Sequence, residues 1–154
     1  MQLLIIIQLL YSGLYFILAG QAVFYKLCFA KVFNEIPATE FISIRRLADP
    51  ILQSRLSIIY YSSLGLGITY LVLMAVYGTP ANLVLATLAL LLLCADIMLA
   101  KRHNIPLNLK IRQIDDTTGA LARQLQHEWI KWIEIRGHFI LAGFFVLLFL
   151  AVTR

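Results

Sequence analysis

The sequence predicts an all-α fold, a four-helix transmembrane bundle with short amphipathic interfacial helices on the cytoplasmic side. The chain is 61% apolar and only 14% charged, whereas soluble domains are about half apolar and a quarter charged. Four apolar segments each approach the roughly 20 residues that cross about 30 Å of hydrocarbon at about 1.5 Å per residue. These segments are continuous rather than alternating, which favours helices over barrel strands.

We expect a single membrane domain over residues 1–154, with spans near residues 3–30, 56–77, 81–100 and 133–152. The second span has no charged residue, the first has only Lys26 near its end, and the third has only Asp96. The first residues lack the basic group of a signal peptide, so the first segment is interpreted as a retained helix.

The first connection is expected to break the helix at residues 31–37 and to continue as a short helix at residues 38–53. Pro37 suits the start of that helix, and its mixture of charged and apolar positions is typical of a helix lying on the membrane surface. Asp49–Pro50 is expected to break the chain again before the second span. Residues 78–82 are too few for anything but a tight hairpin, which makes the second and third spans antiparallel neighbours.

Two explanations fit the pattern Asn104-x-Pro106-x-Asn108. In the structural one, Asn104 and Pro106 end the third helix and Asn108 caps a short helix near residues 109–114. In the functional one, the two amides donate to a ligand oxyanion. Residues 115–119 contain capping residues and predict a further break, after which one helix is expected from about Gly119 to Val152.

The distribution of charge predicts the orientation. Every Lys and Arg except Arg154 falls in or beside the first or third connection, and these two connections lie on one side of the membrane. The positive-inside rule places them in the cytoplasm and both termini outside. Topology therefore explains the net charge of +5 without nucleic acid as a partner, and we expect a bacterial inner membrane.

Trp129, Trp132 and Arg136 are spaced by three and four residues, so they share one helix face. They are candidates for a pocket wall, with the indoles stacking on a flat ligand and Arg136 holding an anion. The alternative is an interfacial belt, because Trp and Arg are common at the headgroup level.

Ionisable and sulfur-bearing residues offer less specific signals. Asp96 lies within a span, which makes it a candidate functional residue, although it can equally pair with a basic residue near the interface. The histidines, including His138, have no metal-ligand spacing, so neither a metal nor a cofactor is expected. Cys28 and Cys94 form no Cys-x-x-Cys motif and are interpreted as small buried hydrophobic residues.

The order of the motifs resembles a known family. Asn104-Ile-Pro-Leu-Asn108 is followed by Trp129-x-x-Trp132-x-x-x-Arg136 and a last apolar helix, after Ile36-Pro37-x-x-x-Phe41 and Asp49-Pro50 in the first half. Over nearly the whole chain this pattern is similar to the anthrone-oxygenase-like family of small membrane proteins, most of whose bacterial members have no known function.

The resemblance implies a four-helix membrane bundle. From a few fungal members it implies cofactor-free oxidation of an anthrone to an anthraquinone by dioxygen, at a site lined by Asn108, Trp129, Trp132 and Arg136. The family often has Asn or His just after the second Trp, where this chain has Ile133 and Glu134. His138 is near enough in sequence to replace that base.

The leading hypothesis is therefore cofactor-independent oxidation of a flat, lipophilic phenol or quinol that enters from the lipid bilayer. Asn104, Asn108, Trp129 and Trp132 would bind it. Arg136 would stabilise a phenolate, and His138 or Asp96 would accept the proton. The alternative is a non-enzymatic accessory or ligand-binding subunit of a larger membrane complex, and a homo-oligomer is also open. A transporter ranks last because the midplane is nearly all apolar.

Overall fold

The computed structural model describes residues 2–115 and 119–153, and within these ranges the chain forms four long helical rods and no strand. Each rod is long and apolar enough to cross a membrane. The predicted all-α four-helix bundle is thus confirmed, and an integral membrane protein follows from the composition of the rods. The elements are α1 Gln2–Phe24, the π-helical turn η1 Tyr25–Phe29, α2 Ala30–Glu35, α3 Ala38–Tyr77, α4 Pro80–Leu99, the π-helical turn η2 Ala100–Asn104, α5 Ile105–Gln113 and α6 Ala120–Val152.

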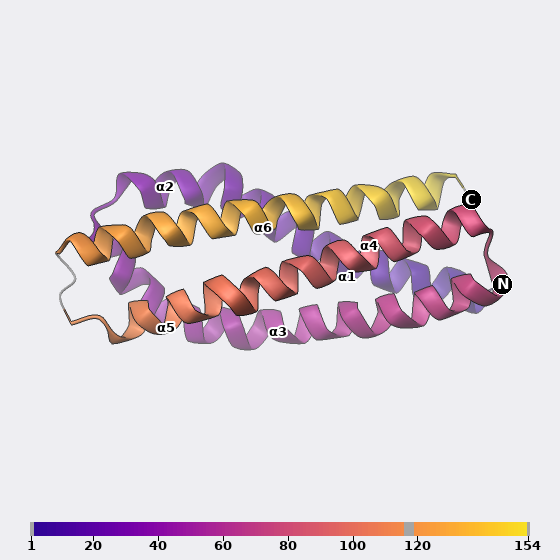
Figure 1. Cartoon of the computed structure of the whole chain (residues 1–154), viewed down its shortest axis with the longest axis horizontal. Helices are drawn as coiled ribbons and strands as arrows, with labels where there is room; N and C mark the ends of the chain where they lie inside the picture. Colours follow the sequence, from indigo (N-terminus) through magenta and orange to yellow (C-terminus); the bar gives the residue numbers. More distant parts are fainter. Residues whose placement is uncertain (1, 116–118, 154) are drawn as a thin grey trace.

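The rods run antiparallel along one long axis (Figure 1). Both marked chain ends and the α3–α4 turn lie at one end of the bundle, and the α2–α3 connection lies at the other end with the close of α5 and the start of α6. α6 packs against α4 and α1, and α3 packs against the same two helices from the opposite side. Both segments rich in basic residues therefore belong to the same end.

The interior has two apolar clusters, one in each half of the bundle. The cluster nearer the chain ends includes Tyr11, Tyr15, Met74, Leu93 and Leu147. The cluster nearer the connections is built around aromatic rings and includes Phe33, Phe41, Ile111, Leu125 and Trp129. Around the first cluster, large apolar side chains also point outward and are exposed, as expected of a surface that lipid covers; examples are Leu9, Phe16, Ile68, Val72, Leu91 and Phe145.

The predicted hairpin is confirmed, and it is only two residues long. Gly78 and Thr79 separate α3 from α4. The Thr79 hydroxyl accepts a hydrogen bond from the backbone N–H of Asn82 at 3.3 Å. Pro80 occupies the first turn of α4, where a missing backbone N–H costs nothing. A Cβ at position 78 would lie 2.6 Å from the Met74 carbonyl oxygen, so the turn requires glycine.

The prediction of a separate surface helix at residues 38–53 was wrong, as was the break at Asp49–Pro50. α3 is one helix of 40 residues with Pro50 inside it. A proline removes one backbone hydrogen bond, here to the Arg46 carbonyl, at a cost of about 3 kcal/mol. Burial of Phe41 and Ile42, both fully enclosed, offsets that cost, and the Arg45–Asp49 ion pair bridges the turn before the proline.

The predicted end of the third helix at Asn104 was also wrong. The backbone continues through η2, where the Ile105 amide bonds to the Ala100 carbonyl, into α5 with Pro106 in its first turn. The wider π turn accommodates the proline without ending the rod. Asn108 lies inside α5 and caps nothing. The first rod passes its own π turn in the same way and continues through α2, so the break predicted over residues 31–37 was too long and covers only Ile36–Pro37.

Three further predictions concern the last connection, the last helix and the cysteines. Of the predicted break at residues 115–119, positions 116–118 lie outside the described residues. The single long helix after Gly119 is confirmed, because α6 runs from Ala120 to Val152. Cys28 is exposed and Cys94 is half-buried, so neither is the fully buried residue that was predicted.

Candidate functional site

A pocket of about 160 Å³ lies in the half of the bundle nearer the connections, and all four rods line it. It forms where η2, which packs on α6 and α4, stands away from α3. Apolar side chains make up most of its wall. The residues that line it include Tyr25, Arg45, Asp49, Leu52, Gln53, Leu56, Ser57, Tyr60, Tyr61, Lys101, Asn104, Ile105, Trp129 and Arg136.

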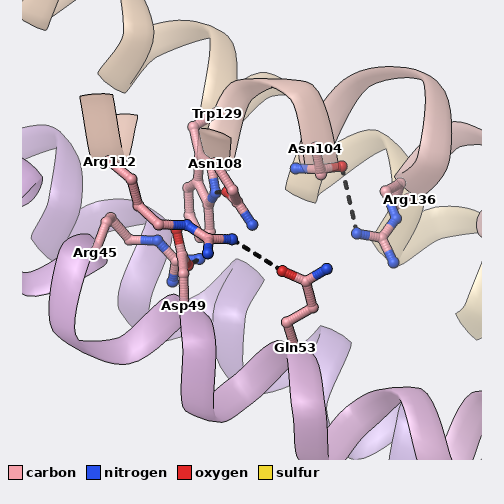
Figure 2. A network of polar contacts seen from close by, with 8 residues as sticks. All are labelled: Arg45, Asp49, Gln53, Asn104, Asn108, Arg112, Trp129 and Arg136. Atoms are coloured by element: carbon pink, nitrogen blue, oxygen red, sulfur yellow. Dashed lines mark hydrogen bonds and ion pairs between the residues drawn. The ribbon is translucent and has the colours of Figure 1, made fainter. Parts of the chain in front are cut away.

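The mouth of the pocket lies between α3 and the η2–α5 segment. The lining residues that are exposed, Gln53, Tyr61 and Lys101, all lie on these two elements. Two side-chain contacts cross the mouth. Arg112 of α5 donates to the Gln53 amide oxygen at 3.0 Å, as Figure 2 shows, and the Lys101 ammonium lies 6.0 Å from the centroid of the Tyr61 ring.

A buried ion pair forms the inner wall at one end of the pocket. Arg45 and Asp49 lie one turn apart on α3, where opposite charges face each other, and the Arg45 guanidinium donates to Asp49 Oδ1. Arg45 is 4% exposed and Asp49 is 1% exposed. The guanidinium carbon also lies 4.1 Å from the centroid of the Trp129 ring, a cation–π contact that gains strength where water is excluded (Figure 2).

Three polar atoms of the pocket lining are buried and have no hydrogen-bond partner among the residues that the structure describes. They are Arg45 Nε, Asp49 Oδ2 and Asn104 Nδ2. Buried polar groups are nearly always paired, with protein, water or ligand. The residues that carry these atoms all line the pocket, and together they have two unpartnered donors and one unpartnered carboxylate acceptor beside which a ligand with donor and acceptor groups can bind.

Arg136 is the centre of a second polar network at the other end of the pocket. Its Nε donates to Asp96 Oδ1 at 2.7 Å and its Nη2 to Asp96 Oδ2 at 3.1 Å, a bidentate pair that fixes both groups. Nη2 also donates to the Tyr60 hydroxyl at 3.1 Å, and Nη1 to the Asn104 amide oxygen at 3.3 Å (Figure 2). Asp96 thus pairs with a basic residue, one of the two alternatives left open by the sequence.

The two tryptophans do not meet at one surface. Trp129 lines the pocket, but Phe33 and Phe41 pack against it edge-on, and its indole Nε1 donates to Asn108 Oδ1 at 3.0 Å. Trp132 lies outside the pocket lining and stacks on the His103 ring, with centroids 3.5 Å apart and planes 9° apart. Protein groups therefore occupy the positions where stacking on a ligand was expected.

His138 lies away from the pocket. It is exposed, and its Nε2 lies 2.7 Å from the Lys26 ammonium. Of the residues predicted from sequence, Asn104, Asn108, Trp129 and Arg136 line the pocket, and Asp96 lies directly behind Arg136. Trp132 and His138 do not line it. Within residues 2–115 and 119–153, no group of three His, Cys, Asp or Glu is placed to hold a metal ion.

Sequence reasoning missed Arg45, Asp49, Tyr25 and Tyr60 as pocket residues. Arg45 and Asp49 are opposite charges four residues apart in a segment that otherwise has apolar residues at helical spacing, which was a usable signal. It was overlooked because Pro50 was expected to end that helix. Tyr25 and Asn104 each belong to a π turn and line the pocket; such turns are frequent at functional sites.

Comparison with protein-family models, with curated proteins and with solved structures gives no match to this chain. The chemistry of the pocket is therefore the basis for a function.

Proposed function

We propose that this chain is a bacterial inner-membrane protein that binds a flat, lipophilic phenol or quinol and oxidises it with dioxygen without a cofactor. One observation carries the proposal: a mostly apolar pocket is lined by Arg45, Asn104 and Asp49, each with a buried donor or acceptor atom that has no hydrogen-bond partner among the described residues. The likeness of its motifs to the anthrone-oxygenase-like family supports the same reaction class.

A phenol or quinol can supply hydrogen-bond partners for the unpartnered atoms of the pocket lining. Its hydroxyl donates to Asp49 Oδ2 and accepts from Arg45 Nε, and a second oxygen, such as the far hydroxyl of a quinol, accepts from Asn104 Nδ2. Each buried polar group without a partner costs about 1–3 kcal/mol, and ligand binding would remove that cost. The tyrosines and aliphatic residues of the wall provide the apolar surface that a flat ring requires.

In the proposed chemistry, Asp49 accepts the proton and Arg45 stabilises the anion that forms. The electron-rich anion then reduces dioxygen. For an anthrone, the ring methylene becomes a carbonyl with one oxygen atom, and the second oxygen leaves as water with the two hydrogens. Arg136 acts as a positioning residue, because it holds the Asn104 amide oxygen so that Nδ2 remains free. Both oxygens of Asp96 accept from Arg136, which makes Asp49 the better base.

The test is oxygen uptake by the detergent-purified protein with an anthrone. Empty micelles correct for autoxidation, and Glu40→Gln, at an exposed carboxylate of the same helix, is the matched control for Asp49→Asn. We expect uptake above the micelle rate in the wild type and in Glu40→Gln, and at least a tenfold loss in Asp49→Asn. Wild-type uptake equal to that of micelles would reject the oxidation.

A ligand-binding or accessory subunit without chemistry is the second candidate. The observation that favours it is that Arg45 and Arg136 are each already paired with a carboxylate of the same chain, so neither guanidinium of the pocket wall is an unpaired charge. Quenching of tryptophan fluorescence by the phenol without oxygen uptake, together with co-migration in a larger complex on a native gel, would support this candidate over the enzyme.

A further inference from the structure

We call the opening of the pocket between α3 and the η2–α5 segment the slot. Its two ends are set by the contacts that cross it, Arg112 with Gln53 and Lys101 with Tyr61. Gln53 and Tyr61 are eight positions apart on α3, about 12 Å at about 1.5 Å per residue. Between them, half-buried Leu56 and Ser57 on one lip face Ile105 on the other, so the lips are mainly aliphatic.

One end of the slot lies at the membrane surface. The charge-free stretch of α3 begins at Leu56, directly after Arg55, and tyrosine and lysine side chains such as Tyr61 and Lys101 are typical of the headgroup level. α3 has 40 residues, about 60 Å of helix, which is about twice the hydrocarbon thickness. The pocket therefore extends away from the bilayer, and Asp49 lies 12 residues, about 18 Å, beyond Tyr61.

The Arg45–Asp49 end of the pocket and the aliphatic slot are thus ordered along the membrane normal, and the network of Arg136 and Asn104 lies at the end nearer the bilayer. The unpartnered atoms of Arg45 and Asp49 lie at the end far from lipid, and the aliphatic slot leads back toward it. A small flat molecule bound at Asp49 would leave the bilayer completely. A molecule with an aliphatic tail would keep that tail along Leu56 and Ile105 and in the hydrocarbon, so the tail would not be exposed to water.

From this order we infer that the ligand is a phenol or quinol with a long aliphatic tail, and that the tail leaves through the slot and returns to the bilayer. The inference rests on the proposed function and narrows its substrate class from free aromatic molecules to membrane-resident, tailed ones. The pocket walls also suit a neutral polar head group, because the opposite charges cancel within the Arg45–Asp49 pair and within the Arg136–Asp96 pair.

The experiment compares two probes, a decyl-substituted benzoquinol and its methyl-substituted counterpart, in nanodiscs, with each concentration expressed as a mole fraction of lipid. Binding is followed by quenching of tryptophan fluorescence. Ser57→Trp narrows the slot, and Ser62→Trp, at an exposed position of the same helix that does not line the pocket, is its matched control. In the wild type and in Ser62→Trp we expect the decyl probe to bind at least tenfold more tightly than the methyl probe. In Ser57→Trp the ratio of the two dissociation constants should be near one.

The outcomes separate the two proposals. Equal binding of both probes by the wild type, or a tail preference that survives in Ser57→Trp, would overturn the inference and leave the proposed function standing. Failure of the wild type to bind either probe would reject the proposed function itself. If Ser57→Trp fails to fold, cross-linking of the wild type with a diazirine at the end of the decyl tail decides. Labels in residues 57–68 or 91–101 support the tail path, and labels in residues 119–130 contradict it.

Discussion

At the scale of residues, several hydrogen bonds hold the Arg136–Asp96 ion pair in place. Arg136 makes four hydrogen bonds to side chains of α3, α4 and η2, and Asp96, its carboxylate partner, is fully enclosed. An ion pair of this kind adds little net stability compared with apolar packing, but removing one partner leaves the other charged in a low-dielectric interior. The pair therefore fixes how α4 and α6 meet.

We expect Asp96→Ala to lower the free energy of unfolding by about 3–5 kcal/mol, the cost of leaving one partner of a buried pair uncompensated. Denaturant titration of the protein in detergent, followed by circular dichroism, measures the change. The double variant Asp96→Ala/Arg136→Met removes both charges and should recover a large part of the loss. Equal stabilities of the single and double variants would show that the charges are not coupled.

Gly143 packs against the ring of buried Tyr15. A Cβ at Gly143 would collide with the Tyr15 hydroxyl and lie 2.6 Å from its Cζ, whereas a Cβ at Gly13 would meet nothing within 4 Å. Tyr15 is fully buried and its hydroxyl donates to the Ala89 carbonyl at 3.3 Å, so the ring has little room to move.

Gly143→Ala should therefore destabilise the protein by about 1–3 kcal/mol, the usual cost of overpacking. Gly13→Ala, which adds the same methyl group on an exposed helix surface, should be neutral or slightly stabilising. Thermal unfolding of the two variants side by side provides the measurement. A melting temperature for Gly143→Ala equal to that of Gly13→Ala would contradict the tight contact.

At the scale of elements, the site depends on how α5 is attached to α3. The Arg46 guanidinium donates to the carbonyl oxygens of Ile111 and Ile114, which lie at the C-terminal end of α5, where carbonyls lack helical partners. A cation there also interacts favourably with the helix dipole. Arg46 thus holds the short helix that carries Asn108 and forms one lip of the slot.

Arg46→Gln should loosen α5 without unfolding the bundle. We expect hydrogen exchange to rise at least fivefold in peptides covering Ile105–Gln113, because the terminal carbonyls lose their donor, and to stay unchanged in α4. Arg112→Gln is the comparison, since Arg112 donates to the exposed Gln53 side chain on α3 and not to the terminal carbonyls of α5 that Arg46 holds. Similar exchange in α5 of both variants would mean that Arg46 does not anchor it.

At the scale of the whole molecule, the bundle is longer than a membrane is thick. The half toward the chain ends has exposed apolar side chains around it, and the half toward the connections carries the two basic segments and the pocket. This division supports the proposal that one half is embedded in lipid while the other extends into the cytoplasm.

The proposed orientation predicts opposite labelling of the two ends. In a background of Cys28→Ser and Cys94→Ser, a cysteine at exposed Ala81 should react with a membrane-impermeant thiol reagent in intact cells. A cysteine at exposed Asn34 should react only after the cells are permeabilised. The reverse pattern would place the termini in the cytoplasm and contradict the positive-inside rule for this chain.

The sequence by itself determined the class of fold, the number of spans and the shared side of the two basic connections. These follow from the length and composition of apolar segments, which are local properties. It also identified Asn104, Asn108, Trp129 and Arg136, four residues that line the pocket. Their helical spacing was visible in the chain, although the partners of their side chains were not.

Only the tertiary structure decided which charges pair and where the helices end. Pro50 and Pro106 are local signals to stop a helix, and packing of Phe41, Ile42 and Ile111 overrides them. The pairing of Asp96 with Arg136 joins residues 40 positions apart. The unpartnered atoms of Arg45 and Asp49 belong to a candidate site only because all four rods meet around one pocket. Contacts between distant segments form when the free energy gained by burial exceeds the conformational entropy lost in ordering the chain. That difference depends on several segments at once and cannot be calculated from any one of them.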